Sequence, residues 1–156
     1  MVSTVVGNEL SSYVLAFPFI QGWWATIRPD AVHDGIGYVS LAPSLLASFL
    51  WVALYAVFYD VVFYAGHRML HWSSFAYKVH ALHHSTFATI GLSHHYMSWL
   101  DFVLEVLAPV LLPVAIVGIP AAPLPCLIGV GGANGVFVHS GWNLPIFPPP
   151  HDHFYH

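Results

Sequence analysis

The chain has 156 residues, of which 58% are hydrophobic and 6% are charged, and its mean hydropathy is +0.71. Soluble domains carry about a quarter charged residues, so this composition excludes an ordinary soluble domain. Three Lys and Arg residues against seven Asp and Glu residues are too few cations to neutralise a phosphate backbone, which excludes nucleic acid as a partner. We expect an all-α integral membrane protein with transmembrane helices.

Residues 1–35 are expected to form an N-terminal interfacial segment. Its apolar stretch, Ser11–Trp24, has 14 residues, whereas a membrane span needs about 20. The stretch ends in Trp23 and Trp24, and such an aromatic pair is typical of the membrane interface. Asn8 and Glu9 interrupt the apolar pattern early. No basic segment precedes the stretch, so we do not expect a cleavable signal peptide.

The stretch Ser44–Gly66 predicts the first transmembrane helix, because it is long enough to cross and contains Asp60 as its only charge. Asp60 lies near the membrane end of this span. A carboxylate there is either functional or solvated at a helix end, and both interpretations stay open.

A second apolar stretch, Phe102–Val138, predicts a helical hairpin. Its 37 residues are too many for one crossing and fit two, with Glu105 as the only charge. Prolines place the turn near Gly118–Pro125, and the second helix would return His139 to the side from which the first began. Small residues would let the returning helix pack closely on a neighbour: Gly131, Gly132 and Gly135.

Seven of the twelve histidines lie between His67 and His95, and their spacing is ordered. His67 and His71 form an HxxxH box, which places both imidazoles on one helical face about 6 Å apart. A second box with the pattern HxxHH is formed by His80, His83 and His84.

In one unbroken helix the histidines of the two boxes would face different directions, because each residue turns the helix by about 100°. The boxes therefore need a break between them if they share a site. Ser73 and Ser74 lie between the boxes, and serine favours the N-cap of a new helix.

A third histidine group follows the hairpin and includes the HxxH pair at the end of the chain. Boxed histidines beside a membrane have no packing rationale, because apolar side chains fill space at a lower desolvation cost. We therefore predict a metal site, whereas His94 and His151 are expected to be solvated loop residues. The predicted ligands are His67, His71, His80, His83, His84, His95, His139, His153 and His156.

This ligand set exceeds the three or four ligands of a single zinc ion, so it implies two metals. Imidazole suits zinc, copper, iron and nickel, and the ligand type alone does not choose among them. The lone cysteine, Cys126, excludes a thiolate metal site and an internal disulfide.

The segment Tyr64–His84, with HxxxH, eight intervening residues and HxxHH, resembles the fatty acid hydroxylase and sterol desaturase superfamily of membrane di-iron oxidases. The sequence HSGWNLP from His139 onward resembles the HSGxxxP stretch that precedes the last box of this superfamily. In that register His153 and His156 begin the last box. The resemblance implies that residues 36–156 form a fatty acid hydroxylase-like membrane domain that is incomplete at its C-terminus.

One departure from the superfamily concerns the His-Pro-x-Glu element that many relatives carry after the second box. Ser98–Asp101 stands at that place, so Asp101 replaces the acid and the histidine is missing. His95, about one helical turn earlier, is the residue that would substitute for it.

The resemblance implies a function as well as a fold. It implies two iron ions, dioxygen as co-substrate, and hydroxylation, desaturation or methyl oxidation of a sterol or fatty-acyl lipid, with no catalytic residue beyond the metal ligands. Electrons would come from NAD(P)H through a b-type cytochrome or a reductase. Arg68 and Lys78 place the histidine boxes on the cytoplasmic side, and the endoplasmic reticulum is the expected membrane. Two alternatives stay open: a catalytically inactive lipid-binding relative, and a metal-binding or metal-transport membrane protein.

Overall fold

The computed structural model describes residues 1–27, 45–86, 90–117 and 124–145. Every regular element in these ranges is helical, which confirms the prediction of an all-α fold. Two helices are long and apolar enough to cross a membrane, as predicted for an integral membrane protein. They are Leu45–His71 and Trp99–Ile116, and the second joins the elements α6, η3 and most of α7 named below. In chain order the elements are α1 (Val2–Ile27), α4 (Leu45–His71), α5 (Ser74–His80), η1 (His83–Ser85), η2 (Gly91–His95), α6 (Trp99–Phe102), the π-helical turn η3 (Val103–Leu107), α7 (Ala108–Val117) and α8 (Leu124–His139).

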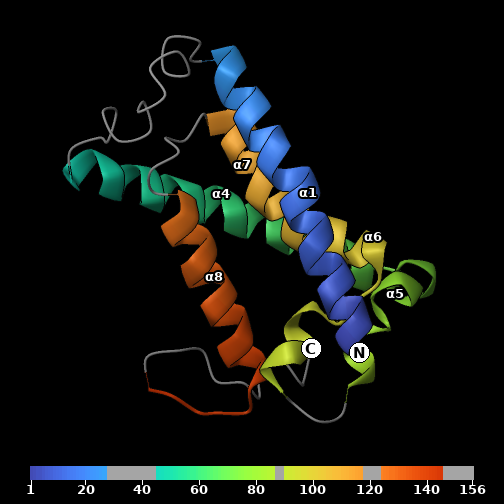
Figure 1. Ribbon diagram of the computed structural model, residues 1–156. Helices are drawn as coiled ribbons and strands as arrows, with labels where there is room; N and C mark the ends of the chain where they lie inside the picture. The colour runs from blue at the N-terminus through green and yellow to red at the C-terminus, as the bar shows by residue number, and fades with distance from the viewer. Residues whose placement is uncertain (28–44, 87–89, 118–123, 146–156) are drawn as a thin grey trace.

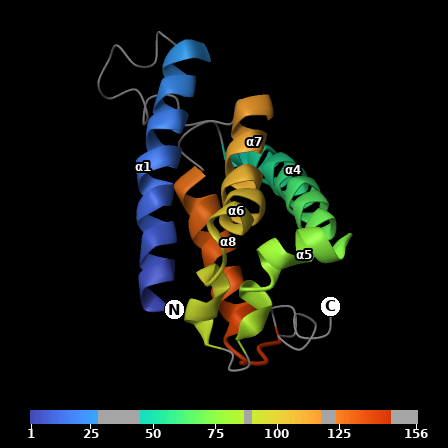
Figure 2. The same cartoon turned by 90° about the vertical axis from the view of Figure 1, so that its right-hand side faces the viewer.

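The long helices are arranged so that the histidine-bearing segments meet at one end of the molecule. Helix α1 runs alongside α7, and α4 crosses them at an angle (Figure 1). The short elements η1 and η2 gather at the end of the molecule where α8 finishes (Figure 2). The C-terminal end of α4, which leads into α5, lies near the same region.

Helix α4 confirms the first predicted span and extends it past Gly66 to the end of the HxxxH box. Phe49 and Leu50 are 68% and 58% exposed, as expected for large apolar side chains that a bilayer would cover. On the opposite side Tyr55 packs against Val114 of α7, and its hydroxyl donates a hydrogen bond to the carbonyl of Val110 at 3.5 Å. The contact with α7 therefore fixes the direction in which the last turns of α4 point.

Helix α1 differs from the sequence expectation, which was a short apolar piece over residues 11–24. The helix has 26 residues, from Val2 to Ile27. Asn8 and Glu9 do not interrupt it, because partners in η2 and in the residues just after it accommodate both polar side chains. The amide of Asn8 donates to the carbonyls of His95 and Met97 at 3.0 and 3.3 Å, and Glu9 accepts a hydrogen bond from the ring of His95.

The predicted break between the two histidine boxes is confirmed. Helix α4 ends at His71, and α5 begins at Ser74 with Ser73 as its N-cap. The Ser73 hydroxyl accepts a hydrogen bond from the backbone N–H of Ala76 at 3.1 Å. This cap satisfies one of the free N–H groups at the start of the helix. The chain thereby turns, and the second box folds back onto the first.

The predicted hairpin is formed by α6, η3 and α7 on the way out and by α8 on the way back, as Figure 1 shows. Its outward arm begins at Trp99, slightly before the expected Phe102. The predicted turn lies largely outside the described residues, which omit 118–123. Helix α8 ends at His139, and this residue reaches the second histidine box, as the hairpin requires.

The glycines of α8 are used differently from the expectation. A Cβ added at Gly131 or Gly132 would meet nothing within 4 Å, so neither residue is needed for close packing among the described residues. Gly135 alone of the three lies against a neighbour, the ring of His94. Among the described residues the predicted close packing is therefore found at Gly135, because α8 approaches η2 near its C-terminal end, where Gly135 lies.

Candidate metal centre

Six of the nine predicted ligands come together at one end of the helices. Neighbouring ring centroids lie 4.7 Å apart for His67 and His71 and 4.5 Å apart for His80 and His84. An imidazole bound through nitrogen has its centroid about 3.2 Å from the ion, so two such rings on one ion lie about 5 Å apart. The spacing of the rings therefore suits shared metal ions. The six converging residues are His67, His71, His80, His83, His84 and His139.

Four of these rings form what we call the α4 group, which consists of His67, His71, His80 and His84. The ring nitrogens of the first three lie within 4.8 Å of one another, close enough to bind a single ion. The ring of His84 lies 5.2 Å from His71 and 4.5 Å from His80. The α4 group thus joins both predicted boxes into one cluster.

A buried carboxylate holds His80 in this cluster. Asp101 and His80 are both 0% exposed, and the two carboxylate oxygens lie 3.0 and 2.9 Å from Nδ1 of His80. An ionised carboxylate only accepts hydrogen bonds, so Nδ1 carries the proton and Nε2 carries the lone pair. That Nε2 atom is buried and has no hydrogen-bond partner in the described part of the chain. A buried lone pair without a donor is what a metal ion would satisfy.

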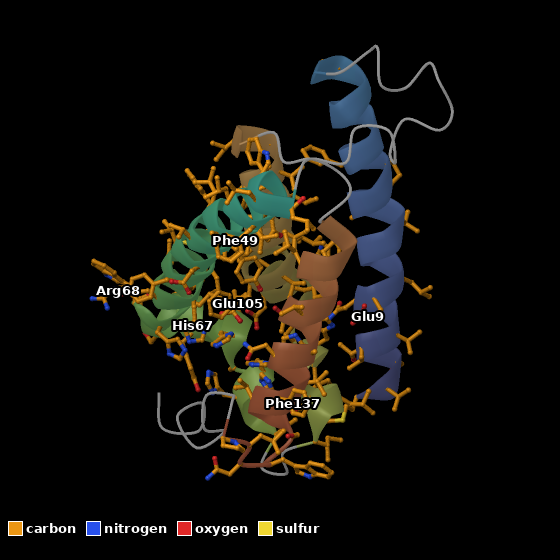
Figure 3. All side chains as sticks on the ribbon, turned by 90° about the vertical axis from the view of Figure 1, so that its left-hand side faces the viewer. Glu9, Phe49, His67, Arg68, Glu105 and Phe137 are labelled. Carbon is orange, nitrogen blue, oxygen red and sulfur yellow. The ribbon has the colours of Figure 1, made fainter. Side chains whose placement is uncertain are left out.

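Glu105 holds His67 in the same way. Its Oε1 atom lies 2.6 Å from Nδ1 of His67 and 3.7 Å from Nδ1 of His80. Figure 3 shows the side chains of His67 and Glu105 close together, with Glu105 in the interior. Glu105 lies in the π-helical turn η3, and such turns are rare and frequent at functional sites. Asp101 and Glu105 thereby support neighbouring rings from one continuous helix.

The remaining two rings, His83 and His139, form what we call the α8 group. Nδ1 of His139 lies 2.8 Å from the carbonyl of Gly135. A carbonyl only accepts, so Nδ1 carries the proton and Nε2 of His139 has the lone pair. This Nε2 atom lies 3.1 Å from Nε2 of His83, and the ring centroids are 5.0 Å apart. Two imidazole nitrogens that face each other are well placed to share an ion.

Among the described residues, the predicted ligand His95 does not join the two groups. The ring of His95 donates from Nδ1 to Glu9 and stacks on His94, with 4.2 Å between ring centroids. This hydrogen bond lowers the pKa of the Glu9 carboxyl. His153 and His156 lie outside the described residues.

Ser98, the first residue of the stretch that departs from the superfamily pattern, has a structural role. Its hydroxyl donates to the carbonyl of Val79 at 2.8 Å and caps α6 by accepting from the backbone N–H of Asp101 at 3.2 Å. Ser98 thereby ties α6 to α5. Because α6 carries Asp101 and α5 carries His80, this contact helps to bring the carboxylate to the ring.

Sequence reasoning missed two functional candidates. Glu105 could have been found from the sequence, since it is the only charge in the stretch Phe102–Val138 and carboxylates inside apolar spans are usually functional. The same argument applies by sequence to Asp60, whose side chain is exposed. His94 was expected to be a solvated residue, but its ring lies 5.2 Å from that of His139. Its contact depends on the approach of η2 to α8, which has no local sequence signal.

The donor set fits iron. It consists of imidazole nitrogens, which suit iron as well as zinc, copper and nickel, and carboxylates accept hydrogen bonds from the far side of the rings, as they do in many metal centres. The buried Nε2 atom of His80, which has no donor among the described residues, is the observation that points most directly to a cation.

Comparisons with known proteins agree with the motif-based resemblance. Residues 52–156 match the family described as fatty acid hydroxylase. Fatty acid hydroxylase domain-containing protein 2 of Macaca fascicularis and of Homo sapiens are each 25% identical to the chain over 159 aligned positions, which cover 99% of the chain. The chain spans 44% of the length of these relatives. No solved structure matches it significantly. Since the family match covers both histidine boxes and the hairpin, the chain belongs to the fatty acid hydroxylase family.

Proposed function

We propose that the protein uses dioxygen to hydroxylate, desaturate or methyl-oxidise a sterol or fatty-acyl lipid at a site that holds two iron ions. Membership of the fatty acid hydroxylase family supports a lipid hydroxylase-like role. The observation that carries the proposal is the convergence of six histidines from separate helices, with the rings of His67 and His80 held by buried carboxylates.

One iron would be held by the α4 group and the other by the α8 group, to which the terminal histidines His153 and His156 would add ligands. Bound iron would supply the activation of dioxygen and the oxidation of an unactivated C–H bond. Zinc has no redox chemistry, so it would not support this reaction.

The carboxylates of Asp101 and Glu105 act on the rings rather than on the substrate. Each accepts the Nδ1 proton of a histidine and so keeps the lone pair on Nε2, with that atom directed away from the carboxylate. Each also adds negative charge beside neutral rings, which raises the basicity of the imidazole nitrogen. Asp101 and Glu105 are thus positioning residues for the α4 group.

The membrane arrangement suits a lipid substrate. Helix α4 exposes large apolar side chains along its length and carries His67 and His71 in its last turns, so a lipid in the bilayer lies next to the helix that leads to the site. We assign residues 36–156 to the membrane oxidase domain and residues 1–35 to an N-terminal segment. Arg68 and Lys78 are exposed near the histidines, which favours the cytoplasmic side of the endoplasmic reticulum membrane for the site. A b-type cytochrome or a reductase that uses NAD(P)H would then reach it.

The test is metal analysis combined with turnover. The protein is purified in detergent, loaded anaerobically with ferrous iron, and supplied with NADPH, a b-type cytochrome with its reductase, and a sterol or a fatty-acyl lipid. The proposal expects two irons per chain, lipid-dependent dioxygen consumption and an oxidised lipid by mass spectrometry. Iron binding without oxidised product from either lipid class would favour an inactive lipid-binding relative. Metal flux across vesicles, without oxidation, would favour a transporter.

A further inference from the structure

His94 lies on η2 at the point where this turn packs against α8. Its ring centroid is 5.2 Å from that of His139 and 4.2 Å from that of His95. The ring is partly buried, unlike that of a solvated loop residue. It therefore lies directly beside the α8 group.

Gly135 makes room for this ring. A Cβ added at Gly135 would overlap three ring atoms of His94, whereas a Cβ added at Gly129, Gly131 or Gly132 of the same helix would meet nothing within 4 Å. Gly135 precedes His139 by one helical turn, so a ring over Gly135 lies on the face that carries His139. The same glycine accepts the Nδ1 hydrogen bond of His139 through its carbonyl. One residue thus admits one imidazole and orients the other.

Contacts with α1 hold η2 in place on its other side. Asn8 donates to the backbone carbonyls of His95 and Met97 at 3.0 and 3.3 Å, and Glu9 accepts from the ring of His95; Figure 3 shows where Glu9 lies on α1. The turn is fixed between α1 and α8, and the position of His94 is fixed with it.

We propose that His94 is a ligand of the metal ion that the α8 group binds, together with His83 and His139. The inference rests on the proposed two-metal function. The rings of His83 and His94 have centroids 5.0 and 5.2 Å from that of His139, which is the spacing of about 5 Å expected for imidazoles that share an ion. Three elements, η1, η2 and α8, would each supply one ring.

The sequence predicted His95 as a metal ligand, whereas we assign this role to His94. Nδ1 of His95 binds Glu9, and of the two neighbouring histidines it is His94 whose ring contacts His139. His95 then acts with Glu9 to anchor η2, and His94 binds the metal.

A cysteine at each position distinguishes the two histidines by spectroscopy. The protein is loaded with cobalt(II), and the absorption spectra of His94→Cys and His95→Cys are compared with that of the original sequence, which provides the background from Cys126. A thiolate bound to cobalt gives a charge-transfer band in the near ultraviolet. The proposal expects this band for His94→Cys alone. Its absence from His94→Cys, or its appearance in His95→Cys instead, would overturn the proposal.

Metal stoichiometry gives a second readout that does not depend on turnover. His94→Ala removes the ring, and Gly135→Ala displaces it without changing any histidine, so both variants should weaken binding of one of the two metals by at least about tenfold. Gly131→Ala is the matched control on the same helix and should bind both metals as the original does. Unchanged binding in both test variants would refute the role of His94. Absence of metal from the original protein would instead contradict the proposed function.

Discussion

The two histidine groups of the candidate metal centre are supported in different ways. In the α4 group, the rings of His67 and His80 are held by Glu105 and Asp101 in the interior of the protein. In the α8 group, the ring of His139 is held by the neutral backbone carbonyl of Gly135. The rings of the α4 group are therefore oriented by ionisable side chains, whereas the ring of His139 is oriented by the backbone of α8.

This difference predicts unequal metal affinities. A carboxylate behind a histidine raises the basicity of the ring and offsets part of the charge of the bound cation, whereas a peptide carbonyl supplies only a dipole. We expect the α4 group to fill first as metal is added and to release its ion last. Titration of metal-free protein with cobalt(II), followed by absorption, should therefore show two steps.

The largest expected effect comes from breaking the α8 group. His83→Ala removes the ring whose Nε2 lies 3.1 Å from that of His139. We expect lipid oxidation to fall below detection and bound iron to fall toward one ion per chain. Helix content by circular dichroism should stay unchanged, because membrane helices are stabilised by apolar length and internal backbone hydrogen bonds.

His94 does not take the place of the lost His83 ring in that variant, because η2 holds His94 over Gly135. Full activity in His83→Ala would show that the α8 group is not required for the reaction. Loss of both metals would show that the two groups do not bind independently.

The sequence alone predicts much of this arrangement. The spacing of the HxxxH and HxxHH boxes requires a break between them, and the pair Ser73 and Ser74 provides it, because serine can cap a helix with its own hydroxyl. The length of the second apolar stretch likewise predicts a hairpin that returns His139 to the same end. These features depend on local periodicity and on chain length, which a sequence displays directly.

Other features depend on partners that are far away in the chain. Asn8 and Glu9 look like interruptions of a helix, because their partners follow more than 80 residues later. The support of His80 by Asp101 and the contact of His94 with Gly135 need packed helices before they exist. The π-helical turn η3 has no composition signal in VLEVL, so the direction of Glu105 was not predictable.

Removal of the Asp101 carboxylate tests whether the α4 group is supported separately from the α8 group. Asp101→Ala should lower the metal affinity of the α4 group by about 10- to 100-fold and leave that of the α8 group unchanged. Asp101→Asn should lose less, because the amide oxygen still accepts from Nδ1 of His80. The matched control is Asp60→Ala, which removes an exposed carboxylate of α4. Equal losses in both groups on cobalt titration would contradict separate support.

Gly66→Ala tests the close contact that places His67 beside Glu105. A Cβ at Gly66 would lie 2.9 Å from the backbone carbonyl oxygen of Leu104 in η3, and the backbone has little room to yield. We expect a loss of about 1–3 kcal/mol in the free energy of unfolding relative to Gly131→Ala. Gly131→Ala controls for the gain in helix propensity, because its added Cβ meets nothing within 4 Å. Denaturant unfolding in detergent measures both, and equal stabilities would show that α4 and η3 can separate without cost.

The smallest expected effect comes from the cap that turns the chain between the two boxes. Ser73→Ala leaves the backbone N–H of Ala76 without its side-chain acceptor, which costs about 1 kcal/mol at a typical N-cap. Since water can reach this exposed site, the helix should persist, and the cost should appear as a modestly weaker metal affinity of the α4 group, because α5 carries His80. Ser74→Ala is the neighbouring control, since Ser73 is the residue that caps α5. If the two variants bind metal equally well, packing of α5 against α4 and α6, rather than the cap, sets the position of His80.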